Sequence, residues 1–141
     1  MRAARRIIVH SLDDARAALK AASELSVPVT LASAEGAGGY AGAMWFRAVI
    51  ELATAEHPAV AVTAVLDCAD EAGTVLNALR HGLKRVRFTG SGATLKRLEE
   101  IARQRGAEIE TGRRPPALDL WHERDPETAC RAYLASKRRR R

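Results

Sequence analysis

The sequence predicts an α/β domain whose parallel sheet of about five strands is built from successive strand–helix units. Short apolar segments alternate with amphipathic segments along the whole chain, a pattern typical of such units rather than of hairpins. A chain of 141 residues fits one domain with a hydrophobic core. Its 47% hydrophobic and 28% charged residues are ordinary globular usage.

The first two units each open with a short apolar strand. The first strand, 6–10, is followed by Ser11, whose hydroxyl suits the N-cap of an amphipathic helix that runs to about Glu24. The second strand, 27–33, is apolar and β-branched, and it leads into a glycine-rich loop. The helix predicted over 43–56 then carries aromatic and aliphatic side chains at helical spacing.

The third and fourth units repeat the pattern. The strand at 59–66 is almost unbroken in its apolar character, as expected of a strand buried on both faces. Its helix ends near Gly82, a suitable C-cap. The strand at 86–89 is followed by a Gly-Ser-Gly turn and a helix over 93–105.

The fifth strand, 107–110, is too short and polar for a central place in a sheet. The segment 111–121 contains two consecutive prolines and is predicted to be a loop. A last helix begins at Asp125, which suits an N-cap, with Pro126 in the first turn.

The net charge of +6 is concentrated at the two ends of the chain. Residues 131–141 contain six basic side chains and no acid, and three more arginines lie before residue 7, so the body over 7–130 carries −3. The run at 137–141 would attract a phosphate backbone or anionic lipid, but a solvated tail is the simpler interpretation. We expect one domain over 1–136, a basic tail over 137–141 and no nucleic-acid partner.

The two cysteines bear on the cellular compartment in which the chain is expected. Cys68 and Cys130 lie on different predicted elements without CxxC spacing, and no secretory signal precedes them, which favours reduced thiols and a cytoplasmic location. No segment approaches the roughly twenty apolar residues that a membrane helix needs, so no membrane partner is expected.

Chemistry in parallel α/β sheets gathers just beyond the carboxyl ends of the strands, which directs attention to 33–42, 67–71, 90–92 and 110–114. The glycine-rich segments there either present backbone N–H groups to an anion or simply make tight turns. Neither is a dinucleotide or P-loop signature.

One strand end combines carboxylates with a thiol. Asp67, Cys68, Asp70 and Glu71 would suit acid–base chemistry or a metal. Asp70 and Glu71 are equally well explained as first-turn acids facing a helix dipole, and Cys68 as a small buried hydrophobe. The four histidines, His10 among them, show no zinc-binding spacing.

Taken in order, these segments resemble the class II fructose-bisphosphate aldolases. The family's second strand and its loop resemble Val27-Pro28-Val29, Glu35-Gly36-Ala37 and Tyr40-Ala41-Gly42. Its third strand, following helix and fourth strand resemble His57-Pro58-Ala59-Val60, Leu66-Asp67, Ala78-Leu79-Arg80-His81-Gly82 and 86–91. Its fourth helix and fifth strand are similar to 101–110, and the start of the helix that enters its sixth strand resembles 125–129.

This resemblance implies a reaction in which a divalent metal polarises a ketose-phosphate carbonyl while an aspartate moves the proton. Asp67 stands at the position of that aspartate. A metal-binding histidine follows it in the family, and Cys68 stands there instead, so zinc is expected only if the ancestral site is retained. The family's active-site serine aligns with Ala34, next to Ser33, and its carboxylate-rich segment after the fifth strand is replaced by 112–114.

The resemblance covers only five units of the family's barrel, without its later metal histidines. It therefore implies a non-catalytic binding or interaction module without a cofactor, with a sugar-phosphate or anion site at Gly90, Ser91 and Gly92. The first alternative is a zinc-dependent aldolase or lyase completed by a partner subunit. The second is a binder of nucleic acid or an acidic partner through 137–141.

Five units also pose a packing problem, because they cannot close an eight-stranded barrel. We expect either an open doubly wound sheet or a partial TIM-type barrel. In the partial barrel, an apolar inner face would need covering by a second copy of the chain or by another subunit.

Overall fold

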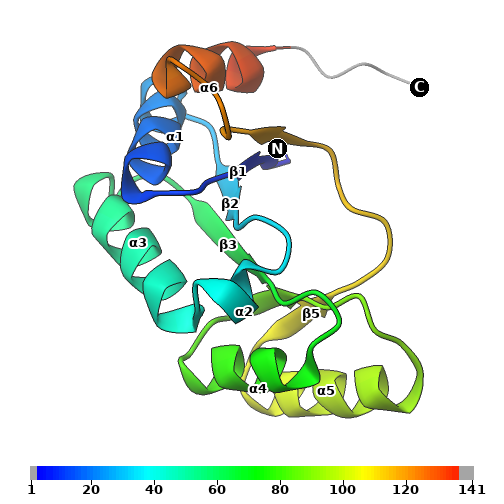
Figure 1. Cartoon of the computed structure of the whole chain (residues 1–141). Coiled ribbons are helices and arrows are strands. Elements are labelled where there is room, and N and C mark those ends of the chain that lie inside the picture. The colour runs from blue at the N-terminus through cyan, green and yellow to red at the C-terminus, as the bar shows by residue number, and fades with distance from the viewer. Residues whose placement is uncertain (1–2, 137–141) are drawn as a thin grey trace.

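The computed structural model describes residues 3–136, which form a parallel six-stranded sheet in the order β5-β4-β3-β2-β1-β6 (Figure 1). The strands are β1 (Arg5–Ile8), β2 (Val29–Ala32), β3 (Val62–Asp67), β4 (Arg85–Arg87), β5 (Glu108–Glu110) and β6 (Ala117–Asp119). Every neighbouring pair is parallel, which confirms the predicted α/β class. The short, polar β5 lies at an edge, as its sequence predicts.

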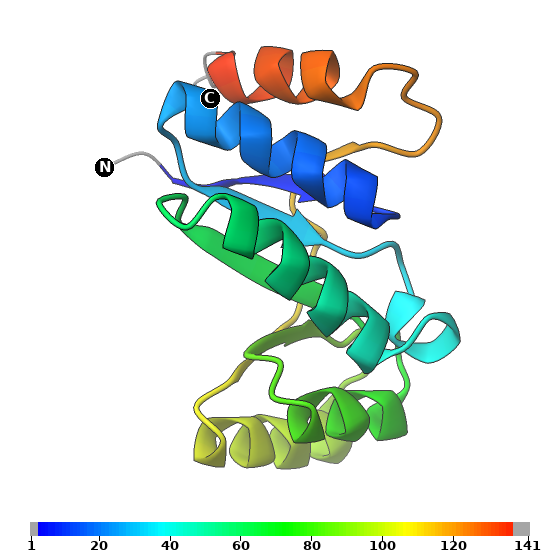
Figure 2. The same cartoon turned by 90° about the vertical axis from the view of Figure 1, so that its left-hand side faces the viewer.

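The helices cover one face of the curved sheet (Figure 2). They are α1 (Leu12–Leu25), α2 (Ala37–Tyr40), α3 (Ala43–Glu56), α4 (Ala72–Arg80), α5 (Gly92–Gln104) and α6 (Pro126–Ala135). One-sided coverage is the arrangement of a partial barrel. The alternative of a doubly wound sheet is therefore wrong.

Local chemistry explains where two helices begin. The Ser11 side chain accepts a hydrogen bond from the Asp14 backbone N–H at the start of α1. The Asp125 carboxylate accepts one from the Thr128 N–H at the start of α6, and Pro126 occupies the first turn. Both side chains satisfy N–H groups that a helix cannot bond internally, as predicted.

The segment 111–121 is not a loop throughout, because residues 117–119 form β6. This strand pairs with β1, with Ile7 opposite Leu118 and Ile8 opposite Asp119. The prediction of a loop is wrong here because a three-residue strand has no readable periodicity. Its pairing partner lies more than a hundred residues earlier in the chain, and only the tertiary structure brings the two together.

The position of β6 also corrects the interpretation of the last helix. In a closed eight-stranded barrel, the strand beside the first on its other side is the eighth. β6 takes that side of β1, and α6 packs on α1, where Lys20 Nζ lies 2.7 Å from Glu127 Oε1. Residues 125–129 therefore begin a helix at the far side of the sheet from α5, and not one that follows β5 in space.

The sheet curls strongly, as one ion pair demonstrates. Arg6 on β1 makes a two-pronged hydrogen bond to Glu110 on β5, across three intervening strands. In a flat sheet, four strand spacings would separate these strands by about 19 Å, beyond the reach of the two side chains. The pair therefore bridges the concave inner face.

The inner face differs from the apolar surface that was expected. Side chains that point away from the helices include Arg6, Thr30, Asp67, Arg87 and Glu110, and the charged ones among them form ion pairs with one another or with Arg114. The connection from β5 to β6 runs along this face (Figure 1), where Pro115 helps to close a small cavity beside Arg6 and Arg87. The inner face therefore combines apolar side chains such as Ile8 and Val65 with charged ones, and a covering partner stays a prediction.

The apolar side chains pack between the sheet and the helices in two clusters. One surrounds α1 and includes Ile7, Leu19, Leu31 and Leu134, while the other lies between β3, β4, α4 and α5. Within 3–136, no helix is long and apolar enough to cross a membrane. The predicted basic tail at 137–141 lies outside the described residues.

Candidate functional site

Asp67 ends β3, and its carboxylate is 4% exposed and bonded at both oxygens. Oδ1 accepts the backbone N–H groups of Gly36 at 3.0 Å and Ala69 at 2.9 Å. Oδ2 lies 3.0 Å from Nη2 of Arg114 and 3.9 Å from Nε of Arg87. This one side chain therefore contacts three segments at once: the loop after β2, the loop after β3 and the connection after β5.

Ser33 follows β2 and ties the carboxyl ends of two strands together. Its Oγ accepts the Asp67 backbone N–H at 2.9 Å and donates to the Ala34 carbonyl at 3.0 Å. The hydroxyl proton is thus used in a hydrogen bond to the backbone. Ser33 as a whole is only 4% exposed. Ser33 therefore supports the position of Asp67 and does not stand in for a substrate-binding serine.

Cys68 packs away from the Asp67 carboxylate, against α2. A Cβ added to Gly38 would lie 3.1 Å from Cys68 Sγ and 2.9 Å from a methyl carbon of Thr74, so only glycine allows α2 to approach this closely. Burial, reinforced by the negative charges of Asp67 and Glu71, raises the pKa of the Cys68 thiol to about 12. The thiol stays protonated at neutral pH, unlike the thiolates that bind metals.

The donor set does not fit a resident divalent metal. Among residues 3–136, no three His, Cys, Asp or Glu side chains converge as a metal site requires. Asp67 already binds a guanidinium, and the Cys68 thiol faces the helix layer. A catalytic zinc needs three protein ligands and an open position.

A buried charge network extends from Asp67 across the inner face. Arg87, 4% exposed, donates to Glu110 Oε1 at 3.0 Å and to the Gly112 carbonyl. Burial opposes ionisation of Glu110, but the hydrogen bonds and charges of Arg6 and then Arg87 outweigh it and lower the Glu110 pKa. Glu110 is thus a carboxylate shared by two guanidinium groups.

This network was missed at the level of sequence. Its signal is the charge at inward positions of very short strands, Arg-Val-Arg in β4 and Glu-Ile-Glu in β5, where alternation places both charges on one face. The polar residues of β5 predicted an edge strand, and they also indicate that the inner face carries charge.

The Gly90-Ser91-Gly92 turn leads into α5, and its glycines have separate structural reasons. A Cβ on Gly90 would lie 2.3 Å from the Phe88 ring, and Gly92 has a φ of +68°. Ser91 is the N-cap residue of α5, yet its side chain makes no capping hydrogen bond, and the first turn holds no acid. The turn is apart from the Asp67 network, with Ser91 and Gly92 exposed.

A second group of polar and aromatic side chains meets at the ends of β1 and β6. His10 Nε2 lies 2.6 Å from Asp119 Oδ1, and the rings of His10 and Trp121 are 5.0 Å apart. The Trp121 backbone N–H donates to the same Asp119 oxygen at 2.9 Å. The sequence analysis placed His10 within the first strand and not among the strand-end segments, whereas in the structure β1 ends at Ile8 and His10 lies just beyond it. Its partners come from the connection predicted to be a loop.

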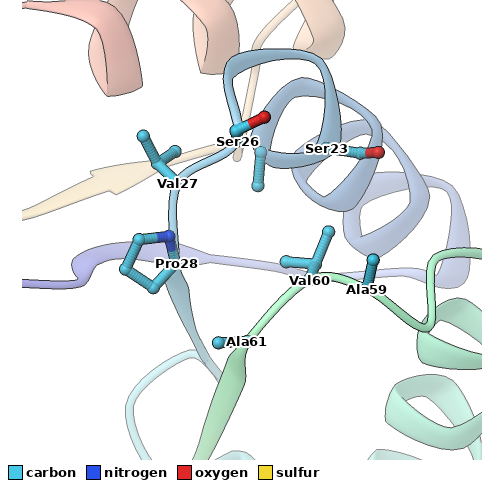
Figure 3. Close-up of a pocket in the computed structure, with 8 residues that line it drawn as sticks. Ser23, Ser26, Val27, Pro28, Ala59, Val60 and Ala61 are labelled. Atoms are coloured by element: carbon cyan, nitrogen blue, oxygen red, sulfur yellow. The ribbon is translucent and has the colours of Figure 1, made fainter.

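The opposite end of the sheet holds a depression of about 540 Å³ beside the starts of β2 and β3 (Figure 3). Its lining is small and apolar, with Val27, Pro28 and Val60 beside Ser23 and Ser26. No lining side chain is charged or titratable in the physiological range. This depression therefore offers no group for acid–base chemistry.

Comparison with known proteins identifies the scaffold. A family model for class II fructose-bisphosphate aldolase matches residues 2–110. Among solved structures, a protein of Coccidioides immitis described as a fructose-1,6-bisphosphate aldolase superposes with a TM-score of 0.65 and 20% identity, over 77% of this chain and 40% of its own. The YdjI aldolase of Escherichia coli K12 gives 0.63 and 18%, over 77% of this chain and 44% of its own.

These likenesses show the fold, and this chain spans less than half the length of either structure. No curated protein matches the sequence. The matched range ends with β5, so β6, α6 and the connection before them lie beyond it. Over the strand–helix units from β1 to β5, this chain belongs to the class II fructose-bisphosphate aldolase family.

Proposed function

We propose that this chain is a non-catalytic binding or interaction module of the aldolase family. The observation that carries the proposal is the engagement of Asp67, whose oxygens are held by Gly36, Ala69 and Arg114. A general acid–base must exchange a proton with a substrate within hydrogen-bond reach. A carboxylate that is 4% exposed and ringed by donors is better suited to fastening the fold.

The positive end of α5 is the proposed site for an anionic ligand, such as the phosphate group of a sugar. The N-caps of α1 and α6 are filled by Ser11 and Asp125, whereas Ser91 leaves the first N–H groups of α5 without a side-chain acceptor. Those N–H groups and the helix dipole favour an anion. This part of the proposal rests on Gly90, Ser91 and Gly92.

The catalytic question is tested by incubating the purified chain with fructose 1,6-bisphosphate and zinc, cobalt or manganese. We expect no triose phosphate above the level given by Asp67→Asn, which serves as the matched control. Formation of triose phosphate that is abolished in Asp67→Asn would contradict the non-catalytic proposal. It would instead indicate that Asp67 transfers the proton in the reaction.

The anion site is tested separately by titration with inorganic phosphate and with fructose 1,6-bisphosphate. Ser91→Asp supplies an internal carboxylate cap, and we expect it to weaken binding by at least about tenfold. Asn77→Asp adds the same charge at an exposed position of α4 and should change little. If phosphate does not bind, or if Ser91→Asp has no effect, the anion site fails while the non-catalytic proposal stands.

A further inference from the structure

A pocket of about 360 Å³ opens at the carboxyl ends of β1 and β2, the end of the sheet where ligands of barrel folds bind. Three aromatic side chains line it, Tyr40 at the end of α2, Trp45 on α3 and Trp121 after β6, together with His10. The rest of the lining is Val9 and three alanines, so the floor is small and apolar. The volume and lining are those of a small-molecule pocket.

His10 supplies a defined hydrogen-bonding group in this pocket. Because the Asp119 carboxylate only accepts hydrogen bonds, the contact at 2.6 Å places the proton of His10 on Nε2. In the neutral imidazole with this tautomer, Nδ1 is an acceptor, and within residues 3–136 the hydrogen bond found for the His10 ring is the one at Nε2. Asp119 is itself held by the Trp121 backbone N–H, which fixes the pair.

Two of the aromatic rings are exposed instead of packed. Trp121 is 60% exposed and Tyr40 is 72% exposed, although the core accommodates Phe46 and Phe88 almost completely. Large aromatic side chains that remain at the mouth of a pocket offer flat surface for stacking at little conformational cost. The Trp121 ring lies against the His10 ring, with 5.0 Å between the ring centroids and an angle of 55° between the ring planes.

We propose that this pocket binds a planar nitrogen heterocycle, which stacks on Trp121 and donates an N–H to His10 Nδ1. A sugar ring fits the lining less well, because each of its hydroxyls needs a partner and the pocket offers few polar groups. A flat heterocycle instead matches aromatic walls with a single acceptor. The site is distinct from the Asp67 network and from the α5 turn, since no residue of either lines it.

The proposal does not depend on the proposed function. Asp119 and Trp121 lie beyond the residues that match the family model, whereas the lining residues from Val9 to Trp45 lie within them. Binding there would succeed or fail whether or not the α5 turn holds phosphate.

The test is titration of the full chain with adenine, followed by calorimetry and by NMR of the two tryptophan indole N–H signals. We expect both signals to shift and a Kd between about 10 μM and 1 mM, ordinary for a ligand of this size. Trp121→Ala should weaken binding at least about tenfold, whereas Trp121→Phe keeps a stacking ring and should stay within about threefold. His10→Ala should weaken it by about five- to tenfold.

The matched control is Leu52→Ala, which removes a 55% exposed side chain of α3 that does not line the pocket, and it should bind adenine as the parent does. Absence of a shift at about 5 mM adenine would overturn the proposal, as would equal affinity in Trp121→Ala. Competition by fructose 1,6-bisphosphate for the same indole shifts would overturn the choice of ligand class. If the indole signals shift with protein concentration and not with adenine, the aromatic residues of the pocket form a contact between copies of the chain, and the proposal is overturned.

Discussion

At the scale of single residues, Asp67 is a structural junction between three connections of the sheet. Asp67 keeps its place at the end of β3, but its oxygens now serve two backbone N–H groups and the guanidinium of Arg114. A carboxylate in the low-dielectric interior is tolerated because Oδ1 accepts two hydrogen bonds and Oδ2 is paired with a guanidinium. The same side chain type at the same strand end thus supports different roles according to what surrounds it.

Both cysteines should be unreactive in the folded chain. Burial raises the pKa of Cys68 and of Cys130 to about 12, so almost no thiolate forms at pH 8. We expect iodoacetamide at pH 8 to label neither thiol in the native state and both in urea. Rapid labelling of Cys68 in the native state would indicate that the thiol opens to solvent, as a metal ligand would need.

Glu110 should make stability sensitive to acid. Its folded pKa lies below the ordinary 4.5, because Arg6 and Arg87 outweigh the effect of burial. A lowered folded pKa gives stability that is complete above the unfolded pKa and is lost as the pH falls through the folded value. The free energy of unfolding should therefore drop below about pH 4.5, and less steeply in Glu110→Gln.

Urea unfolding at a series of pH values measures this slope. Glu99→Gln removes an exposed carboxylate of α5 and should leave the pH dependence unchanged. If Glu110→Gln and the parent lose stability in parallel as the pH falls, the shared carboxylate does not contribute as described.

At the scale of elements, the helix starts separate into filled and unfilled caps. Asp125 bonds the Thr128 backbone N–H, whereas Ser91 makes no equivalent bond at α5. We expect Asp125→Ala to lower the free energy of unfolding by about 1 kcal/mol. Ser91→Ala is the matched comparison and should cost clearly less, because no capping bond is lost; equal costs by urea unfolding would contradict the assignment.

The short strands owe their order to neighbours and not to their own sequences. β4, β5 and β6 have three residues each, and such segments carry almost no intrinsic preference. β5 is held at the edge by pairing with β4 and by the ion pair from Arg6 across the inner face. The charges at inward positions therefore add to the apolar packing of Ile109 in holding this edge strand.

At the scale of the molecule, β6 and α6 pack beside the first strand–helix unit, with β6 paired to β1 and α6 packed on α1. β1 pairs with β2 on one side and with β6 on the other, so neither edge of β1 is open. A partner that extends the sheet would have to pair with β5 or β6. The covering partner that we expected from the sequence thus stays a prediction, with its possible edges now defined.

The docking of α6 should contribute substantially to global stability. Leu134 is 2% exposed and packs in the same cluster as Leu19 of α1 and Ile7 of β1. We expect Leu134→Ala to cost about 2 to 4 kcal/mol, since it leaves a cavity between the two helices. Leu52→Ala, at an exposed position, should cost less than about 1 kcal/mol in the same urea experiment.

The sequence by itself determined the units from β1 to β5, two helix caps and the location of the chemistry-bearing residues at strand ends. These features depend on neighbours within a few residues, through apolar periodicity and side-chain bonds to the nearest N–H groups. Asp67, Cys68 and the Gly90 turn were found in this way, although the sequence did not disclose which atoms they would face.

The tertiary structure alone decided that β6 pairs with β1, that the inner face is charged, and that Asp67 meets Arg114. The pairing of β6 with β1 and the contact of Asp67 with Arg114 join residues dozens to more than a hundred positions apart, so no local pattern encodes them. The pocket of His10 and Trp121 arises from the same long-range pairing, because β6 carries Asp119 to the end of β1. Interactions between near neighbours in the sequence determine the helices and strands, whereas the curvature of the sheet determines which distant side chains come into contact.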